Sequence, residues 1–406
     1  MSFSKEKQQK GRDILLKEVL GKTKSNNRTM LLLPTSTGKT YIGFRALLAQ
    51  NGKPGSLRIW VYEVGNIEGM YQEIKDRGLQ DLFTSIEVVS YASSSKKLNP
   101  VDMEMFDEIH RGLGEKTLRN HDRNKNLSKY KVFTTATLKE TEIYKIEKTF
   151  GKMDTIYTKT LDEVIDMGIV PTPNIVILRV DPDDTKRTEE VKYGKKKFKV
   201  TQKQKLQKIT KDISYWINLY EESPTKSWMK TKFLRLGGSR MSYMADIKTN
   251  VAEALRDIIP DRKIFFCGSV KQAKKIGGTK HTLSSKEKNN EEKLARFNNK
   301  EIDLLTVKQK AKEGTNLVDT QTGVIIQIGN QEREIIQMTG RVLRHPKPVV
   351  FLIVLNDKKD KNLLEKNLNT INYKYVIGDY QVGSSLLENK KDLETKINRI
   401  YNKVLK

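Results

Sequence analysis

The 406-residue sequence has little cysteine, little histidine and no long apolar run. Its one cysteine, Cys267, excludes an intramolecular disulfide and a zinc site built on cysteine, and four scattered histidines disfavour a zinc site built on histidine. Residues 1–20 are charged and lack the apolar stretch of a signal peptide. The longest apolar run, residues 349–355, has the length of a buried strand and is too short to span a membrane. The sequence therefore predicts a cytoplasmic protein with no membrane partner.

Positive charge dominates the composition. Lys and Arg number 76 against 50 Asp and Glu, so the formal net charge is +26. An excess of this size favours a polyanionic partner, with nucleic acid ahead of a membrane surface. The alternative is that the many Lys, Asn and Ile residues only reflect an AT-rich genome. The 15 Tyr, 12 Phe and 3 Trp lie among regular apolar runs, which excludes a wholly disordered chain.

Short apolar strands alternate with helical segments twice along the chain, which predicts an α/β fold with two parallel sheets in tandem. Thr160 and Glu163 have capping-box spacing for a helix over residues 161–167, and Pro171 and Pro173 follow it. We therefore predict one domain over residues 1–172, a second over 173–356 and a helical C-terminal extension over 357–406. His121 and His281 are expected at the surface.

A Lys-rich insertion over about residues 181–260 interrupts the second domain. Residues 192–211 hold nine lysines and no acidic residue, with Tyr193 and Phe198 between them. Gly237 and Gly238 predict a turn. The pattern suggests a clamp on nucleic acid, with contacts from Lys195, Lys196, Lys197 and Arg240. A solvated lysine face over ordinary core aromatics is an equally supported alternative, whereas the acidic residues near 183–190 are spaced too closely for a nuclease motif.

The first candidate for chemistry is a small-residue loop between an apolar strand and a helix. Such a loop lets backbone N–H groups surround a phosphate at the positive end of a helix. Lys39 would reach the β- and γ-phosphates, and the Thr40 hydroxyl would bind Mg²⁺. Position 33 is Leu rather than the Gly of the strict pattern, so a chance match is the alternative. The loop consists of Pro34, Thr35, Ser36, Thr37, Gly38, Lys39 and Thr40.

Two further blocks follow the loop in order. Asp107 and Glu108 suit nucleotide hydrolysis, because Asp107 would hold Mg²⁺ and Glu108 would orient and deprotonate the attacking water. Arg341 and Arg344 share one helix face at i, i+3 spacing and could reach phosphate charge as arginine fingers. The alternatives are a solvated acidic pair and a surface salt-bridging pair.

In this order, these blocks resemble the core of superfamily 2 helicases of the DEAD/DEAH-box type. Residues 135–137, Thr-Ala-Thr, resemble the motif that links hydrolysis to nucleic-acid contact, and residues 265–269 and 312–317 resemble the fourth and fifth motifs. Residues 150–171 resemble the domain junction of the branch that holds the phage UvsW-like helicases and type III restriction translocases. The resemblance covers roughly residues 5–355.

The resemblance implies two RecA-like domains with ATP and Mg²⁺ between them, and a nucleic-acid-dependent ATPase acting as a helicase or translocase. It implies that Gln9, chosen over Gln8, contacts adenine. It also implies that Glu313 and Gly314 contact the nucleotide and that Gln337 takes part in hydrolysis. Nucleic-acid contacts would come from Thr135, Thr137, Ser269 and Thr315.

The same resemblance implies remodelling of single-stranded, duplex or branched DNA in recombination, repair or replication. We expect a phage-encoded monomer in the host cytoplasm, working beside replication or recombination proteins. An RNA helicase, a scaffold with a decayed ATPase and the motor subunit of a restriction complex are the alternatives. Ser36 replaces a usual Gly, and Asp102 and Glu104 make the strand before Asp107 unusually polar. These departures could slow hydrolysis.

Overall fold

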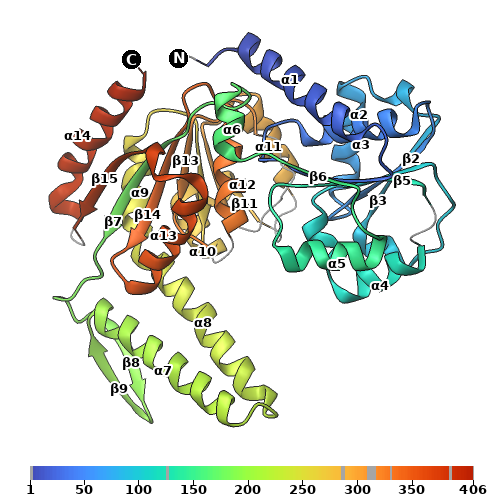
Figure 1. Cartoon of the computed structure of the whole chain (residues 1–406). Coiled ribbons are helices and arrows are strands. Elements are labelled where there is room, and N and C mark those ends of the chain that lie inside the picture. Colours follow the sequence, from blue (N-terminus) through green and yellow to red (C-terminus); the bar gives the residue numbers. More distant parts are fainter. Residues whose placement is uncertain are drawn as a thin grey trace. The chain divides into compact units, whose positions relative to one another are not determined.

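The computed structural model describes residues 3–124, 128–284, 289–308, 317–329, 332–383 and 386–405. The chain forms two compact units, Met1–Pro171 and Thr172–Lys406. Each unit holds one large sheet whose strands are all parallel, with helices packed on it (Figure 1). The predicted fold, two RecA-like α/β domains in tandem, is confirmed.

The first unit is built on a six-stranded sheet of order β3-β2-β4-β5-β1-β6. Its strands are β1 (Arg28–Leu32), β2 (Ser56–Val61), β3 (Ser85–Ser90), β4 (Met103–Phe106), β5 (Tyr130–Thr135) and β6 (Thr155–Thr158). Its helices are α1 (Lys5–Thr23), α2 (Lys39–Asn51), α3 (Asn66–Asp76), α4 (Glu115–Asn124), α5 (Glu140–Phe150) and α6 (Leu161–Asp166), with 3₁₀ turns η1 (Gln80–Leu82), η2 (Tyr91–Ser95) and η3 (Ile109–Gly112). The capping box expected for α6 is present, since Glu163 N donates to Thr160 Oγ1 at 3.2 Å and Thr160 N donates to Glu163 Oε2 at 2.6 Å.

The polar residue of β4, Glu104, belongs to a row of ionic contacts across four strands. Arg58 on β2 faces Glu87 on β3 and Glu104 on β4, and Glu104 faces Lys131 on β5. The Arg58 guanidinium is 2.8 Å from Glu87 and 3.6 Å from Glu104, whose other oxygen lies 3.9 Å from the Lys131 ammonium. Because Arg58 and Lys131 are buried, they need counter-charges, which Glu104 supplies between them and Glu87 supplies to Arg58. The negative charge of Glu104 is therefore required for the stability of this sheet.

Asp102 has a similar structural role at the start of β2. Its Oδ2 accepts hydrogen bonds from the backbone N–H of Ser56 at 2.7 Å and from the Ser56 hydroxyl at 2.8 Å. These bonds lower the pKa of Asp102. The two acidic residues that depart from the family pattern thus stabilise the strands around the acidic pair at 107–108.

His121 is buried, which corrects its predicted surface position. The imidazole lies among aromatic rings, with centroids 4.5 Å from Trp60, 5.4 Å from Phe150 and 5.5 Å from Phe106. Burial lowers its pKa to about 4. The prediction failed because His121 lies on α4, a polar helix whose few apolar residues do not indicate a buried face.

The His121 pKa predicts a loss of stability in acid. The unfolded chain binds a proton on this residue below about pH 6.5, but the folded chain resists protonation down to about pH 4, so stability falls across that window. The loss attributable to His121 is up to about 3 kcal/mol. Denaturant unfolding at pH 7, 5.5 and 4 should show this loss in the wild type and a correspondingly smaller one in His121→Leu. Equal losses in both proteins would show that other groups cause the acid sensitivity.

The second unit is built on a seven-stranded sheet of order β11-β12-β10-β13-β14-β7-β15. Its strands are β7 (Asn174–Val180), β10 (Lys263–Cys267), β11 (Thr282–Leu283), β12 (Leu304–Lys308), β13 (Thr322–Ile325), β14 (Val349–Leu355) and β15 (Val376–Val382). Its helices are α9 (Thr249–Ile258), α10 (Val270–His281), α11 (Asn290–Asn298), α12 (Glu332–Val342), α13 (Lys358–Ile371) and α14 (Leu386–Leu405), with 3₁₀ turn η4 (Tyr373–Tyr375).

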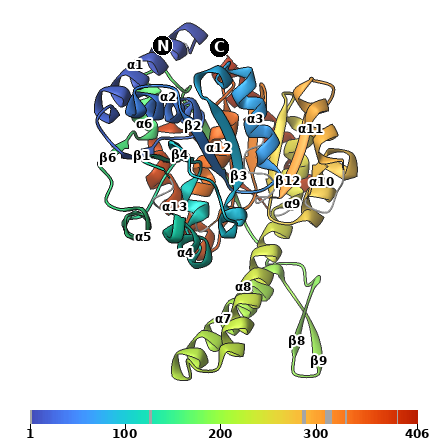
Figure 2. The ribbon, with the colours of Figure 1, turned by 90° about the vertical axis from the view of Figure 1, so that its right-hand side faces the viewer.

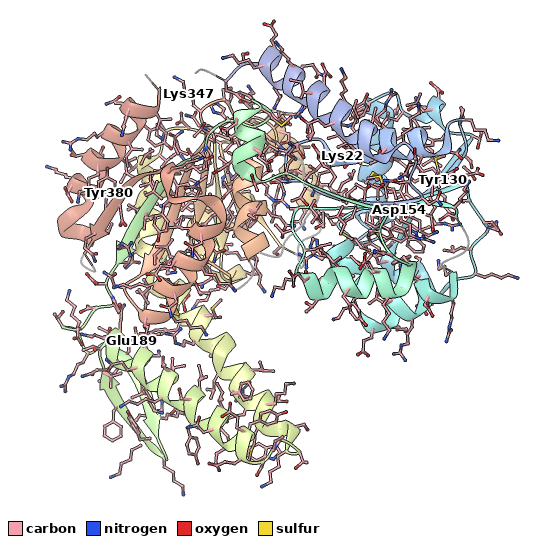
Figure 3. All side chains as sticks on the ribbon, viewed as in Figure 1. Lys22, Tyr130, Asp154, Glu189, Lys347 and Tyr380 are labelled. Carbon is pink, nitrogen blue, oxygen red and sulfur yellow. The ribbon has the colours of Figure 1, made fainter. Side chains whose placement is uncertain are left out.

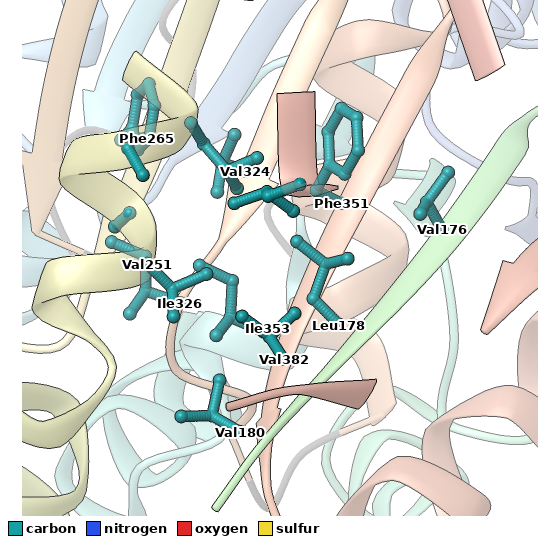
Figure 4. Packing of buried hydrophobic residues seen from close by; sticks show 14 of the residues in the cluster. Val176, Leu178, Val180, Val251, Phe265, Val324, Ile326, Phe351, Ile353 and Val382 are labelled. Atoms are coloured by element: carbon teal, nitrogen blue, oxygen red, sulfur yellow. The ribbon is translucent and has the colours of Figure 1, made fainter. Parts of the chain in front are cut away.

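Apolar side chains from the central strands form the core of this unit (Figure 4). Val324, Phe351 and Ile353 pack with Val251 of α9, and every residue of β14 is buried. The C-terminal extension contributes to the same layer, because β15 pairs in parallel with β7 and Val382 joins the core. The extension is mainly helical, as predicted, and it also contains β15, a polar edge strand without an apolar run.

The insertion forms an arm, defined here as residues 189–247. It consists of an antiparallel hairpin, β8 (Glu189–Tyr193) and β9 (Lys196–Val200), and two antiparallel helices, α7 (Gln202–Glu222) and α8 (Ser227–Ile247). The arm extends away from the sheet of the second unit in both views (Figure 2). The turn predicted at Gly237 and Gly238 is wrong, because α8 runs through both residues. Packing against α7 outweighs the cost of about 1 kcal/mol for each glycine.

No helix within the described ranges is long and apolar enough to cross a membrane.

Candidate nucleotide site

The small-residue loop lies directly after β1, whose neighbours in the sheet are β5 and β6. Two of its residues have left-handed backbone conformations, Ser36 with φ 68° and Gly38 with φ 89°. A hydrogen bond within the loop stabilises it, since the Thr37 hydroxyl donates to the Pro34 carbonyl at 2.8 Å. A second hydrogen bond joins the loop to α1, because Arg12 Nη2 donates to the Ser36 carbonyl at 3.3 Å. Ser36 therefore adopts the conformation in which the family's glycine would be favoured.

Helix α2 begins at this loop without a side-chain cap. Its N-cap is Gly38, which carries no group able to accept from the first-turn N–H groups. Ser4 and Thr160, in contrast, cap α1 and α6 with their hydroxyls. An uncapped helix start in a loop with left-handed residues is suited to an anion such as phosphate. The donor set that ATP requires is present here: backbone N–H groups, the Lys39 ammonium and the Thr40 hydroxyl.

The acidic pair follows β4 and contacts the loop directly. Lys39 Nζ lies 2.6 Å from Glu108 Oε1. Glu108 has a left-handed backbone with φ 47°, an arrangement that costs a non-glycine residue on the order of 1 kcal/mol and is concentrated at functional sites. The carboxylate of Asp107 accepts from the Thr134 hydroxyl at 2.9 Å. The first two predicted blocks follow β1 and β4, which both pair with β5, so they meet at the carboxyl edge of one parallel sheet.

Buried side chains behind the acidic pair fix Glu108. The Thr135 hydroxyl donates to Glu108 Oε2 at 3.2 Å, and His110 Nδ1 lies 2.8 Å from that hydroxyl and 3.3 Å from the same carboxylate oxygen. Thr135 and His110 are buried. Residue 135, which the resemblance assigns to nucleic acid, is therefore positioned to hold Glu108 instead.

The two carboxylates differ in electrostatics. Burial raises the pKa of Asp107 to about 6, and the neighbouring charge of Glu108 adds to this rise. Burial also opposes ionisation of Glu108, but the Lys39 ammonium and His110 outweigh it and hold its pKa below the usual range. Glu108 is thus the more firmly ionised member of the pair.

The same residues fit a magnesium ion held mainly by phosphate oxygens. Within the described ranges, no three His, Cys, Asp or Glu side chains are grouped so that they could hold a metal by themselves. Mg²⁺ in nucleotide sites commonly takes one or two protein oxygens, with phosphates and water completing the octahedron. Thr40 and Asp107 are the residues that would supply them.

Helix α1 presents two glutamines differently. Gln9 is exposed and donates to Asp13 on its own helix at 2.8 Å. Gln8 is half-buried and donates to the Ile169 carbonyl at 2.8 Å. Gln8 also shares a helix face with Arg12, four residues later, which contacts the phosphate loop. The geometry therefore favours Gln8 over the predicted Gln9 as the residue nearer to a nucleotide.

The other predicted residues are spread over both units. Thr137 is half-buried after β5. Ser269 uses its hydroxyl to cap α10, accepting from Gln272 N at 3.1 Å. Gln337 and Arg341 are half-buried on α12, and Arg344 is exposed just after it. Glu313, Gly314 and Thr315 lie outside the described residues.

Arg240 is not available for nucleic acid, which corrects its predicted role. Its side chain is 3% exposed and its guanidinium contacts Asp357 at 2.6 Å and the Thr210 hydroxyl at 2.9 Å. It therefore ties α8 to the start of α13 and to α7. Lys195, Lys196 and Lys197 are exposed at the end of the β8–β9 hairpin, where Lys197 pairs with Glu190 at 2.9 Å.

Sequence reasoning missed Arg12 and Thr134. Thr134 had a usable signal, because it immediately precedes residues 135–137 at the end of a strand. Arg12 had none, since its contact joins two segments through a backbone carbonyl.

Comparison with known proteins agrees with this architecture. Residues 250–346 match the family described as the helicase conserved C-terminal domain. A search of curated proteins found no match. Among solved structures, S. cerevisiae Dbp5 bound to RNA and ADP BeF3 is similar, with a TM-score of 0.58 and 12% identity over 97% of each chain.

Two further solved structures have the same fold. The Pyrococcus furiosus Hef helicase domain gives a TM-score of 0.51 at 14% identity, over 90% of this chain and 99% of that chain. The ATP-dependent type ISP restriction-modification enzyme LlaBIII bound to DNA gives 0.56 at 12% identity, over 97% of this chain and 32% of that chain. The chain therefore has the same fold as these solved structures, and residues 250–346 in its second unit match the helicase conserved C-terminal domain.

Proposed function

We propose that this protein is a nucleic-acid-dependent ATPase of superfamily 2 that acts as a helicase or translocase. The observation that carries the proposal is the contact of Lys39 with Glu108 at 2.6 Å, beside an uncapped helix start. These residues belong to two motifs that are 69 residues apart in sequence. Their pairing in a helicase fold supports an intact hydrolytic site and disfavours a scaffold with a decayed one.

The chain's own residues define the proposed cycle. Bound ATP supplies the phosphoanhydride bond whose hydrolysis drives the motor. Lys39 and the first-turn N–H groups of α2 bind its phosphates, so Lys39 exchanges its Glu108 contact for phosphate oxygens. Glu108, which is ionised and held by Thr135 and His110, is then free to orient a water and accept its proton. For Arg341 and Arg344, the role of arginine fingers stays a prediction from the resemblance.

The proposed track is DNA, with RNA as the alternative. The net charge of +26 supports a nucleic-acid track of either kind. The similar structures include both kinds of ligand, since Dbp5 is bound to RNA and LlaBIII to DNA. We further propose, from the sequence resemblance, a phage-encoded monomer of the UvsW-like branch that remodels branched DNA in recombination, repair or replication.

Strand separation tests this function and its track together. The wild type should displace the labelled strand of a forked DNA when ATP and Mg²⁺ are present, and displacement should stop when Mg²⁺ is chelated. A fork made of RNA serves as the matched substrate. Faster displacement of the RNA fork would replace DNA by RNA as the track. A protein that hydrolyses ATP on nucleic acid but separates neither fork would be a translocase without unwinding activity.

A further inference from the structure

The outer end of the arm carries a cluster of three aromatic rings, of which two are exposed and Trp216 is half-buried. Tyr215 and Trp216 of α7 have ring centroids 5.4 Å apart, and Trp216 lies 5.5 Å from Trp228 at the start of α8. Tyr215 is 58% exposed and Trp228 is 55% exposed. The cluster holds two of the three tryptophans in the sequence, and the third, Trp60, is buried in the first unit. Large rings left in solvent at the end of a projecting element indicate a binding surface.

The arm that carries this cluster also carries uncompensated positive charge. Residues 189–247 contain 14 Lys and Arg against 6 Asp and Glu, a net charge of +8. Five of these cations, Lys197, Lys203, Lys205, Lys208 and Arg240, are paired with carboxylates. In the part of the chain that the structure describes, no carboxylate lies within ion-pair distance of Lys192, Lys195, Lys196, Lys199, Lys211, Lys226, Lys230, Lys232 or Arg235.

Three of the unpaired lysines are close to the aromatic cluster in sequence. Lys226 and Lys230 flank Trp228, and Lys232 lies over the Trp216 ring with its ammonium 5.8 Å from the ring centroid. Aromatic rings beside unpaired cations match the two parts of an unpaired nucleotide chain, whose bases stack and whose phosphates are anionic. A protein partner fits less well, because lysine is depleted in the cores of protein interfaces.

We propose that the end of the arm is a binding site for unpaired bases of nucleic acid. Trp228 and Tyr215 stack on bases, and Lys226, Lys230 and Lys232 contact the adjoining phosphates. This inference rests on the proposed function in one respect, namely that nucleic acid is the protein's track. It adds a second nucleic-acid contact site, outside the two sheets. This site distinguishes unpaired strands from duplex and does not depend on base sequence.

Ion pairs at the root of the arm join its elements to one another and connect the arm to the body of the second unit. Glu189 lies at the root of the arm, where β8 begins (Figure 3). Lys205 forms an ion pair with Glu189 at 2.8 Å, and its ammonium lies 4.4 Å from the Tyr243 ring centroid on α8. Arg240 joins α8 to Asp357, the N-cap of α13. Bases held at the outer end are therefore connected through α8 to the body of the second unit.

The test compares the double variant Tyr215→Ala/Trp228→Ala with the wild type in fluorescence anisotropy. The probes are a labelled single strand, a labelled fork and a labelled blunt duplex of equal length. Removing two stacking rings should weaken binding of the single strand and the fork roughly tenfold or more, and of the blunt duplex less than twofold. The single variant Trp228→Phe keeps a stacking ring at this position and should retain most of the wild-type affinity for the single strand and the fork. ATP hydrolysis without nucleic acid should be unchanged.

Tyr373→Ala is the matched control, since Tyr373 is an exposed aromatic of the same unit outside the arm. Replacing Lys226, Lys230 and Lys232 together by Gln should reduce the slope of log affinity against log salt by about 0.7 for each phosphate that is no longer neutralised. Unchanged affinity of the aromatic double variant for all three probes would overturn the proposal, and so would equal losses on duplex and single strand. Nucleic-acid stimulation of wild-type hydrolysis, measured in parallel, tests the proposed function separately.

Discussion

Glu108→Gln is expected to lower nucleic-acid-stimulated ATP hydrolysis by a factor of roughly 10²–10⁴, the usual contribution of a positioned general base. The glutamine keeps the size of the side chain and its bond to the Thr135 hydroxyl, but it cannot accept the proton of water. It also removes the anion that lies 2.6 Å from Lys39 in the structure. Affinity for ATP should therefore be unchanged or higher in the variant, while turnover is lost.

Steady-state hydrolysis and equilibrium binding of a fluorescent ATP analogue separate these two effects. Glu115→Gln provides the control, because Glu115 is an exposed carboxylate only seven residues later. It should leave both quantities within about twofold of the wild type, as expected for a surface change. Hydrolysis by Glu108→Gln within tenfold of the wild type would contradict the assignment of Glu108 as the base.

Asp360→Leu is expected to lower the free energy of unfolding by roughly 3–5 kcal/mol, because it leaves a buried ammonium without its counter-charge. The side chains of Lys248 and Asp360 are both fully buried and form an ion pair. Lys248 also donates to the Ile326 carbonyl at 3.0 Å, and Asp360 accepts from the Leu355 N–H at 2.8 Å. The pair connects the end of α8 to the first turn of α13 and to the strands β13 and β14.

The double variant Lys248→Met/Asp360→Leu should recover most of this loss, since neither charge then remains buried. Denaturant unfolding of the wild type, both single variants and the double variant gives the coupling energy. The exposed pair Lys396–Asp392 on α14, at 2.5 Å, is the matched control and should contribute less than about 1 kcal/mol. A double variant as unstable as Asp360→Leu would show that poorer packing or the unpaired Leu355 N–H, rather than the unpaired ammonium, causes the effect.

A strand with continuous apolar content could be predicted to the residue. The apolar run at residues 349–355 has the same bounds as β14 (Val349–Leu355), because buried parallel strands are apolar on both faces. The edge strand β15 gave no such signal, since Gly378, Asp379 and Gln381 interrupt its pattern. Helix α8 was misjudged because Gly237 and Gly238 disfavour a helix locally, while its packing against α7 is a tertiary effect.

The candidate site was predictable where it depends on the backbone. Residues at the carboxyl ends of parallel strands lie at one edge of the sheet, so Lys39, Asp107 and Glu108 could be grouped from sequence. The direct pairing of Lys39 with Glu108 depends on side-chain conformations, which a motif does not specify. Arg240 was assigned to nucleic acid because its partner, Asp357, lies 117 residues later in the chain and gives no local signal in the sequence.

The most direct test of the central claim is ATP hydrolysis by the wild type and by Lys39→Ala, each without nucleic acid and with single-stranded DNA, forked DNA or RNA. Wild-type hydrolysis should rise when one of these nucleic acids is added, and the rise should be absent in Lys39→Ala. A wild type that binds the nucleic acids tightly but hydrolyses no ATP with any of them would contradict the claim that this site powers a motor.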